Sequence, residues 1–194
     1  MINIQDFTHN YTQRLIKLLH QIDPNVLASI IVSLEKTITA ESKIYLAGNG
    51  GSAATASHMV NDLGAGLRRR KIVNFDIISL ADNTPVTTAI ANDIGYENIF
   101  YMQLEGLLKK DDLFIAISCS GNSDNILKAA KYAKSIGATI IGITGFDGGE
   151  LKHLSDINFH VDAPSGEYGL VEDIHMILDH IIYSYYISKG TQNV

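Results

Sequence analysis

Short apolar runs rich in β-branched residues alternate with segments of helical periodicity along most of this chain. Between the runs, apolar side chains recur every three or four residues, as they do in amphipathic helices. Strands that are apolar throughout and are separated by helices are typical of a parallel sheet covered on both faces. The pattern therefore predicts an α/β fold. The expected strands lie at 43–47, 75–80, 113–118, 139–144 and 157–161. Among the helices between them, one is expected at 52–67, one opening at Thr84-Pro85 and one at 99–108.

The chain has a length of 194 residues, which suits one domain. We assign residues 1–194 to a single domain, because no linker or repeat interrupts them. Two amphipathic helices are expected within residues 1–40, the second opening at Asp23 and Pro24, which suit an N-cap and a first helical turn. A small sheet cannot bury both helices at its edge, so we expect them to pack partly on a second subunit of an oligomer.

The charge and cysteine content exclude several classes of protein. A formal net charge of -6 argues against a general nucleic-acid-binding surface. The first residues lack the basic and apolar regions of a signal peptide, and no run reaches the roughly 18 apolar residues of a membrane span. The single cysteine, Cys119, excludes an intrachain disulfide and fits a reducing compartment. We therefore expect a soluble cytoplasmic protein with no nucleic-acid and no membrane partner.

Two polar, glycine-containing turns follow the first and third expected strands, and each runs directly into a helix. In an open parallel sheet, ligands bind beyond the carboxyl ends of the strands. A helix N-terminus at that edge offers free backbone N–H groups and the positive end of the helix dipole, which suit a phosphate. The expected binding residues are Asn49, Gly50, Gly51, Ser52, Ser118, Cys119, Ser120 and Ser123.

A serine in such a turn can also serve only as an N-cap, and Ser123 alone would be explained in that way. Two such turns at strand carboxyl ends favour a phosphate site instead. Neither turn carries the glycine pattern of a mononucleotide or dinucleotide site. We therefore expect a small molecule with a terminal phosphate, and no organic cofactor.

Acidic and imidazole side chains gather on two of the expected helices. His58 and Asp62 are four residues apart after the first glycine turn and share a helix face. Glu172 and His180 are eight residues apart on the last helix, about 12 Å along its axis, which suits the length of a sugar. The last helix also carries Asp173, His175 and Asp179. The other histidines, His9, His20, His153 and His160, are expected at the surface.

Four segments of the chain resemble the sugar-isomerase (SIS) domain family: GNGGSAATASHMVNDL, ISCSGNSDNILKAA, TGFDGGELKHLSD and VEDIHMILDH. The resemblance covers nearly the whole chain and is strongest to the branch that acts on a heptose phosphate. It implies a flavodoxin-like three-layer sandwich with a five-stranded parallel sheet, preceded by N-terminal helices. It also implies a homotetramer with active sites at subunit contacts and a sugar phosphate as substrate.

The activity implied by the resemblance is isomerisation between a 2-ketose and an aldose phosphate through an enediol(ate). Asp62 and His180 match the acid–base pair of the family, with either order of roles. The matching substrate-binding positions are Asn49, Ser52, Asp93, Ser118, Ser120 and Ser123, and we expect Glu172 to contact the substrate as well. Some members bind zinc, and the matching ligands for one ion per subunit are His58, Asp62, Glu172 and His180.

Two of these positions depart from the family pattern. Asp62 stands where the family usually has the longer glutamate, and Glu172 stands where it usually has glutamine. A shorter base must lie closer to its proton, because transfer needs about 2.6–3.2 Å between the heavy atoms. The extra carboxylate raises the negative charge of the site, which favours a bound divalent cation or a protonated His180.

The main alternative is a non-catalytic SIS module that binds a replication-initiation protein or senses a sugar phosphate. The two hypotheses differ in whether both acid–base positions keep titratable side chains. Asp62 and His180 are both titratable, which favours an enzyme.

Overall fold

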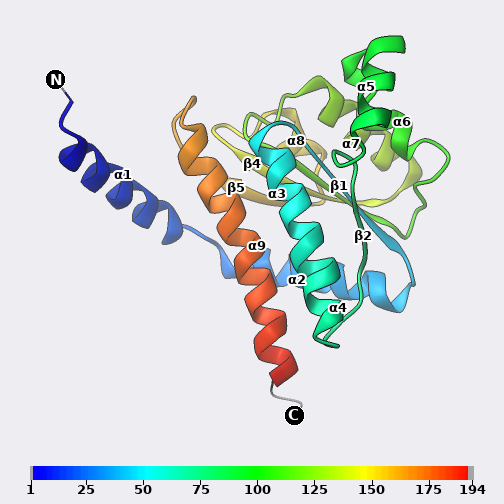
Figure 1. Ribbon diagram of the computed structural model, residues 1–194, viewed down its shortest axis with the longest axis horizontal. Helices are drawn as coiled ribbons and strands as arrows, with labels where there is room; N and C mark the ends of the chain where they lie inside the picture. The colour runs from blue at the N-terminus through cyan, green and yellow to red at the C-terminus, as the bar shows by residue number, and fades with distance from the viewer. Residues whose placement is uncertain (1, 192–194) are drawn as a thin grey trace.

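The computed structural model describes residues 2–191 and contains one parallel sheet with the strand order β2-β1-β3-β4-β5 (Figure 1). All four strand pairs are parallel. This is the flavodoxin-like order, so both the α/β class and the five-stranded sheet are confirmed. The strands are β1 Lys43–Gly48, β2 Asp76–Ser79, β3 Leu113–Ser118, β4 Thr139–Gly145 and β5 Ile157–Val161.

Helices cover the sheet on both faces and form the outer layers of a three-layer sandwich (Figure 1). Alternate residues of β1 show how the sheet divides the core. Leu46 is buried on the face of α2, α3 and α9, whereas Ala47 is buried on the face of α6, α7 and α8. The helices on the Leu46 face are α2 Pro24–Thr39, α3 Gly51–Met59 and α9 Tyr168–Thr191. The helices on the Ala47 face are α6 Tyr101–Leu104, α7 Asp124–Ile136 and α8 Gly149–Leu154.

The helical segment after the first glycine turn, expected as one helix from 52 to 67, is divided in the structure. A π-helix at Val60–Gly66 separates α3 from the short α4 at Leu67–Arg69. The segment passes close to the sheet: a Cβ on Gly64 would lie 2.8 Å from the Ile77 side chain. Wider π-turns occur often at functional sites, and this one carries Asp62.

The two N-terminal helices differ in how they pack on their own chain. Helix α2 buries Ile30 and Leu34 beneath the sheet. Helix α1, Ile4–Leu19, buries only Leu18 and packs on α9 at the edge of the molecule (Figure 1). Contacts within one chain thus explain the packing of α2. The expectation that a second subunit covers an N-terminal helix now applies to α1.

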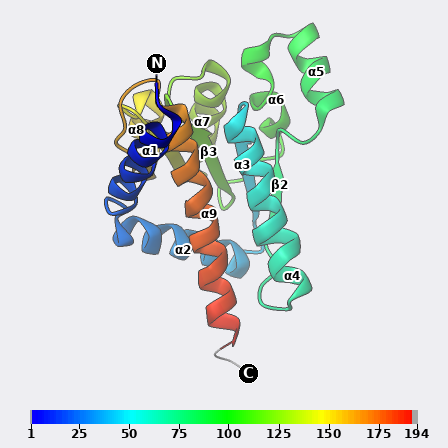
Figure 2. The same ribbon diagram turned by 60° about the vertical axis from the view of Figure 1, so that its left-hand side comes forward.

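Two helical segments lie between β2 and β3. Helix α5, Thr84–Asp93, begins where expected, but it buries none of its residues and stands off the sheet (Figure 2). Of the helix expected at 99–108, only α6 forms, and a 3-10 turn at Tyr96–Asn98 precedes it.

Within residues 2–191, no single helix is long and apolar enough to cross a membrane. Helices α1 and α2 pass that test only as a pair bent by 67°, on length and composition alone. The cytoplasmic location and the single-domain assignment stay predictions.

Candidate functional site

The two glycine-containing turns meet where β1 and β3 lie side by side. Strand order reverses between these two strands, because β2 continues from β1 on one side and β4 continues from β3 on the other. Such a switch point is where open parallel sheets bind their ligands. The turn at 48–52 leads from β1 into α3, and the turn at 118–123 leads from β3 into α7.

A cavity of about 160 Å³ lies between the two turns. Its wall contains six of the residues expected to bind the phosphate, together with Tyr168 and Glu172 from the start of α9. Sequence reasoning missed Tyr168. The full lining is Asn49, Ser52, Ile117, Ser118, Cys119, Ser120, Ser123, Tyr168 and Glu172.

The serine turn directs hydroxyl groups toward this cavity. The Oγ atoms of Ser118 and Ser123 lie 3.3 Å apart, and the Gly121 amide donates to Ser118 Oγ at 3.1 Å. Ser123 occupies the N-cap position of α7, yet its side chain makes no capping hydrogen bond. An N-cap role therefore does not account for its hydroxyl, which remains able to bind a ligand.

The first turn is held in place by amide side chains. Asn49 and Asn125 exchange hydrogen bonds of 2.9 Å, and the Tyr96 hydroxyl donates to Asn49 Oδ1 at 2.9 Å. Gly51 permits close approach of α9, because a Cβ there would lie 2.4 Å from the Glu172 carboxylate oxygens. The turn thus brings Glu172 against the cavity. Burial and then the negative charge of Glu172 raise the pKa of the Cys119 thiol at its base.

A second group of polar side chains lies farther along α3 and α9, which run side by side (Figure 2). One donor atom from each of four residues falls within 4.8 Å of all the others. His58 Nε2 is 3.2 Å from His180 Nε2, 3.5 Å from Asp62 Oδ2 and 3.9 Å from Asp179 Oδ2. The structure therefore brings together Asp62 and His180, the pair expected to carry the acid–base chemistry.

Asp179 is the member of this group that sequence reasoning did not assign. Its side chain is 0% exposed, and neither carboxylate oxygen has a hydrogen-bond partner among the described residues. Burial, and then the negative charge of Asp62, raise the pKa of Asp179 to about 7. The sequence signal was a carboxylate between the apolar positions Leu178 and Ile182 of α9.

The structure places two other expected site residues away from the four-residue group. Within one chain, Glu172 lies in the serine cavity and does not belong to the four-residue group, in contrast to its expected place among the zinc ligands. Asp93 lies exposed at the end of α5, pairs with Asn92, and lines neither site.

Two further histidines lie outside both groups. His160 was expected at the surface, but it is half-buried, and its Nδ1 lies 3.0 Å from Thr144 Oγ1; burial lowers its pKa. His175 is buried, and its Nε2 donates to the Thr144 carbonyl at 3.1 Å.

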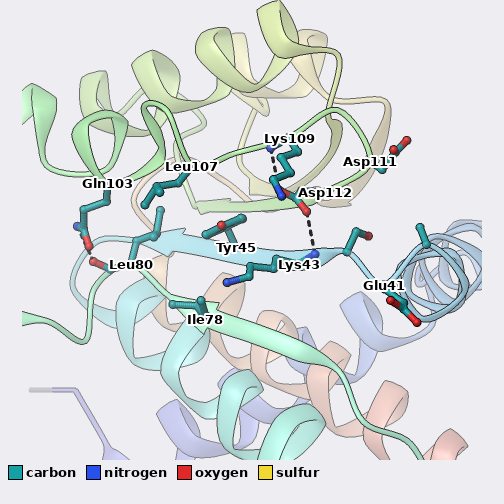
Figure 3. Close-up of a pocket in the computed structure, with 12 residues that line it drawn as sticks. Glu41, Lys43, Tyr45, Ile78, Leu80, Gln103, Leu107, Lys109, Asp111 and Asp112 are labelled. Atoms are coloured by element: carbon teal, nitrogen blue, oxygen red, sulfur yellow. Dashed lines mark hydrogen bonds between the residues drawn. The ribbon is translucent and has the colours of Figure 1, made fainter.

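A larger cavity, of about 520 Å³, lies over β1 and β2 away from the switch point (Figure 3). Two of its polar side chains are already engaged. Asp112 accepts from the Lys43 and Lys109 backbone amides, both at 2.8 Å, and Gln103 donates to the Leu80 carbonyl at 2.9 Å. This cavity also lies away from the helix N-termini at the switch point, so the switch-point site is the better candidate.

Comparison with known proteins finds relatives along most of the chain. A model of the SIS domain family matches residues 6–145. A phosphoheptose isomerase of Aliarcobacter butzleri is 42% identical over 147 residues, 76% of each chain. One from Helicobacter pylori is 41% identical over 149 residues, 77% of this chain and 76% of its own. The solved phosphoheptose isomerase of Neisseria gonorrhoeae superposes with a TM-score of 0.81 at 26% identity, over 96% of this chain and all of its own.

Proposed function

The chain belongs to the SIS-domain family, among its phosphoheptose isomerases, and we propose that it interconverts sedoheptulose 7-phosphate and D-glycero-D-manno-heptose 7-phosphate. One observation carries the proposal. A polar cavity at two helix N-termini lies beside the same pair of helices, α3 and α9, that brings Asp62 and His180 together. This arrangement supports a site in which one small molecule meets both the phosphate-binding groups and the acid–base pair.

The spacing of the two groups suits a phosphorylated sugar. Along α3, Ser52 and His58 are six residues or about 9 Å apart, and along α9, Glu172 and His180 are about 12 Å apart. A heptose with its terminal phosphate among the serine hydroxyls therefore extends its reacting end toward His58 and His180. Phosphate contacts far from the reacting carbons supply orientation, which lowers the barrier without taking part in the chemistry.

Proton transfer between neighbouring carbons is the chemical step. Asp62 removes a proton from the carbon next to the carbonyl, and His180 protonates the carbonyl oxygen to give the enediol. The same two groups then act in reverse at the neighbouring carbon. Either order of the two roles satisfies the geometry, because the side chains adjoin each other.

A divalent cation such as zinc fits the donor set beside this pair. Two imidazoles and the Asp62 carboxylate are ordinary zinc ligands, and a buried carboxylate without a partner lies with them. When bound, such an ion polarises the sugar carbonyl and stabilises the enediolate.

A homotetramer with sites completed between subunits is also part of the proposal. Helix α1 exposes Ile4 and Phe7, and α5 exposes Val86 and Ile94, although apolar side chains of this size are usually covered. A neighbouring copy would cover them and supply a site for Asp93. Light scattering should give four times the chain mass, and Phe7→Glu should reduce it. A monomer at assay concentration contradicts this part.

The activity is tested by following ketose–aldose interconversion with the purified protein, Asp62→Asn and His180→Ala. Each variant should lose about 100-fold or more in kcat, the usual contribution of a positioned acid or base. Asp76→Asn and His153→Ala are matched controls, because both residues are exposed and lie in neither site. Unchanged rates in both site variants would discard the assignment. Activity on C5 or C6 ketose phosphates alone would keep the isomerase and change its substrate.

The non-catalytic alternative receives less support. A binding module has no need to keep two titratable groups in contact beside a phosphate cavity, and the curated relatives named above are isomerases.

A further inference from the structure

The strongest unexplained feature of the molecule is the buried carboxylate of Asp179. An ionised carboxylate removed from water and left without a hydrogen bond is costly, so native proteins pair it, protonate it or give it a metal. Asp179 has no hydrogen-bond partner among the described residues, and Lys or Arg forms no ion pair with it there. The polar atoms that face it are those of His58 and Asp62 on α3 and the π-helix, together with its own neighbour His180.

We propose that Asp179 is the fourth ligand of a divalent metal, completing with His58, Asp62 and His180 a site that one chain builds by itself. This inference rests on the metal occupancy proposed above and replaces Glu172, the ligand expected from the family pattern. Glu172 remains at the serine cavity as part of the substrate site.

The distances match a metal centre. Ligand atoms about 2.0–2.2 Å from a tetrahedral zinc ion lie about 3.3–3.5 Å from one another. From His58 Nε2, the three other donor atoms lie at 3.2, 3.5 and 3.9 Å. The donors therefore need only small side-chain adjustments to close on an ion.

The charges match as well. Two neutral imidazoles and two carboxylates carry a charge of about −2, which a divalent cation balances. The same cation attracts both buried Asp179 oxygens, which without it face the repulsive negative charge of Asp62. When Asp179 binds as well, the ion has two anionic ligands, Asp62 and Asp179.

Backbone position explains why Asp179 and His180 reach one ion although they are adjacent in sequence. Helix α9 packs against α3, with Asp179 on the buried side and His180 at the exposed border. Both side chains bring a donor atom into the same 4.8 Å group, so one ion would contact both. The buried Asp179 would anchor the ion, and the exposed His180 would leave it accessible.

Zinc binding to the full-length protein, stripped with a chelator and titrated calorimetrically, tests the inference. The unchanged protein should bind one zinc ion per chain. Asp179→Asn should weaken binding by at least about 100-fold, since even residues outside the ligand set cost about 10–100-fold. Glu172→Gln and Asp76→Asn should bind zinc as the unchanged protein does.

The outcomes separate this inference from the rest of the proposal. No zinc binding by the unchanged protein refutes the metal and leaves the isomerase to be judged by its rates. Normal zinc binding by Asp179→Asn overturns the role of Asp179 as a ligand and indicates that its carboxyl group is only protonated. Loss of binding in Glu172→Gln alone overturns it in favour of a site shared between subunits.

A second measurement does not depend on the variant folding. Anomalous diffraction at the zinc edge, from crystals of the unchanged protein loaded with zinc, locates the ion directly. An Asp179 oxygen within about 2.0–2.2 Å of the ion supports the inference. A water molecule or Glu172 in that position contradicts it.

Discussion

His58 and His180 place their Nε2 atoms 3.2 Å apart, although 122 positions separate them in the chain. The rings meet edge to face, with centroids 5.2 Å apart. This contact exists because α3 follows β1 and α9 follows the last strand, and both helices cover the same face of the sheet (Figure 2). Both histidines belong to the four-residue group with Asp62 and Asp179, and neither lines the serine cavity.

Lengthening the side chain at position 62 tests whether Asp62 lies close enough to the substrate to act as the base. Asp62→Glu restores the side chain usual in the family and should retain measurable turnover, because a carboxylate stays in the group. Asp62→Asn keeps the length but cannot accept the proton, so its kcat should fall by about 100- to 10,000-fold. Steady-state rates of ketose–aldose interconversion give the comparison. Equal losses in the two variants would mean that placement of Asp62, and not its basicity, matters.

Ser123 should bind phosphate without stabilising its helix. Its side chain does not cap α7, so Ser123→Ala should change the free energy of unfolding by less than about 0.5 kcal/mol while raising KM. Asp23→Ala is the matched control, because Asp23 accepts from the Asn25 amide at 2.8 Å and caps α2. That variant should lose about 1 kcal/mol and keep its KM. Denaturant unfolding and steady-state kinetics measure both, and a normal KM in Ser123→Ala contradicts the binding role.

Gly51→Ala should disturb the site more than the fold. Its Cβ would lie 2.4 Å from the Glu172 carboxylate, which is the movable end of a side chain. We expect a raised KM and a lowered Tm. Combining Gly51→Ala with Glu172→Ala should recover most of the lost Tm, because the second change removes the clash; this is a double-mutant cycle between contacting residues. Additive losses of Tm would show that the clash lies elsewhere.

His175 should make the protein less stable in acid. Burial lowers the pKa of His175 to about 4, only partly opposed by its hydrogen bond to the Thr144 carbonyl. In the unfolded chain this imidazole takes up a proton near pH 6.5, so between pH 6.5 and 4 the unfolded state binds more protons. Stability is therefore complete above about pH 6.5 and falls toward pH 4, by about 3 kcal/mol from this group.

Unfolding by urea at several pH values measures this dependence. His175→Phe cannot be protonated and should show a smaller loss between pH 7 and 4, whereas His153→Ala, at an exposed position, should follow the unchanged protein. The same acid dependence in His175→Phe would assign the effect to other groups.

Much of the fold could be predicted because its signals are local. Each strand from β1 to β5 is a short apolar run bounded by polar or glycine residues, and both glycine-containing turns directly follow such runs. Helix α8 was not foreseen, since its six residues are too few to show a period. The π-helix was also missed, because an extra residue in a helical turn leaves the spacing of Val60–Gly66 looking like an ordinary helix.

By itself, the sequence determined the parallel α/β architecture, the two glycine-containing turns proposed to bind phosphate, and the candidate residues on α3, the π-helix and α9, because these depend on neighbours along the chain. Only the tertiary structure decided that Asp179, and not Glu172, joins His58, Asp62 and His180 within one chain. Periodicity tells which residues share a helix face. It does not tell how two helices slide and rotate against each other, and that packing selects which side chains meet.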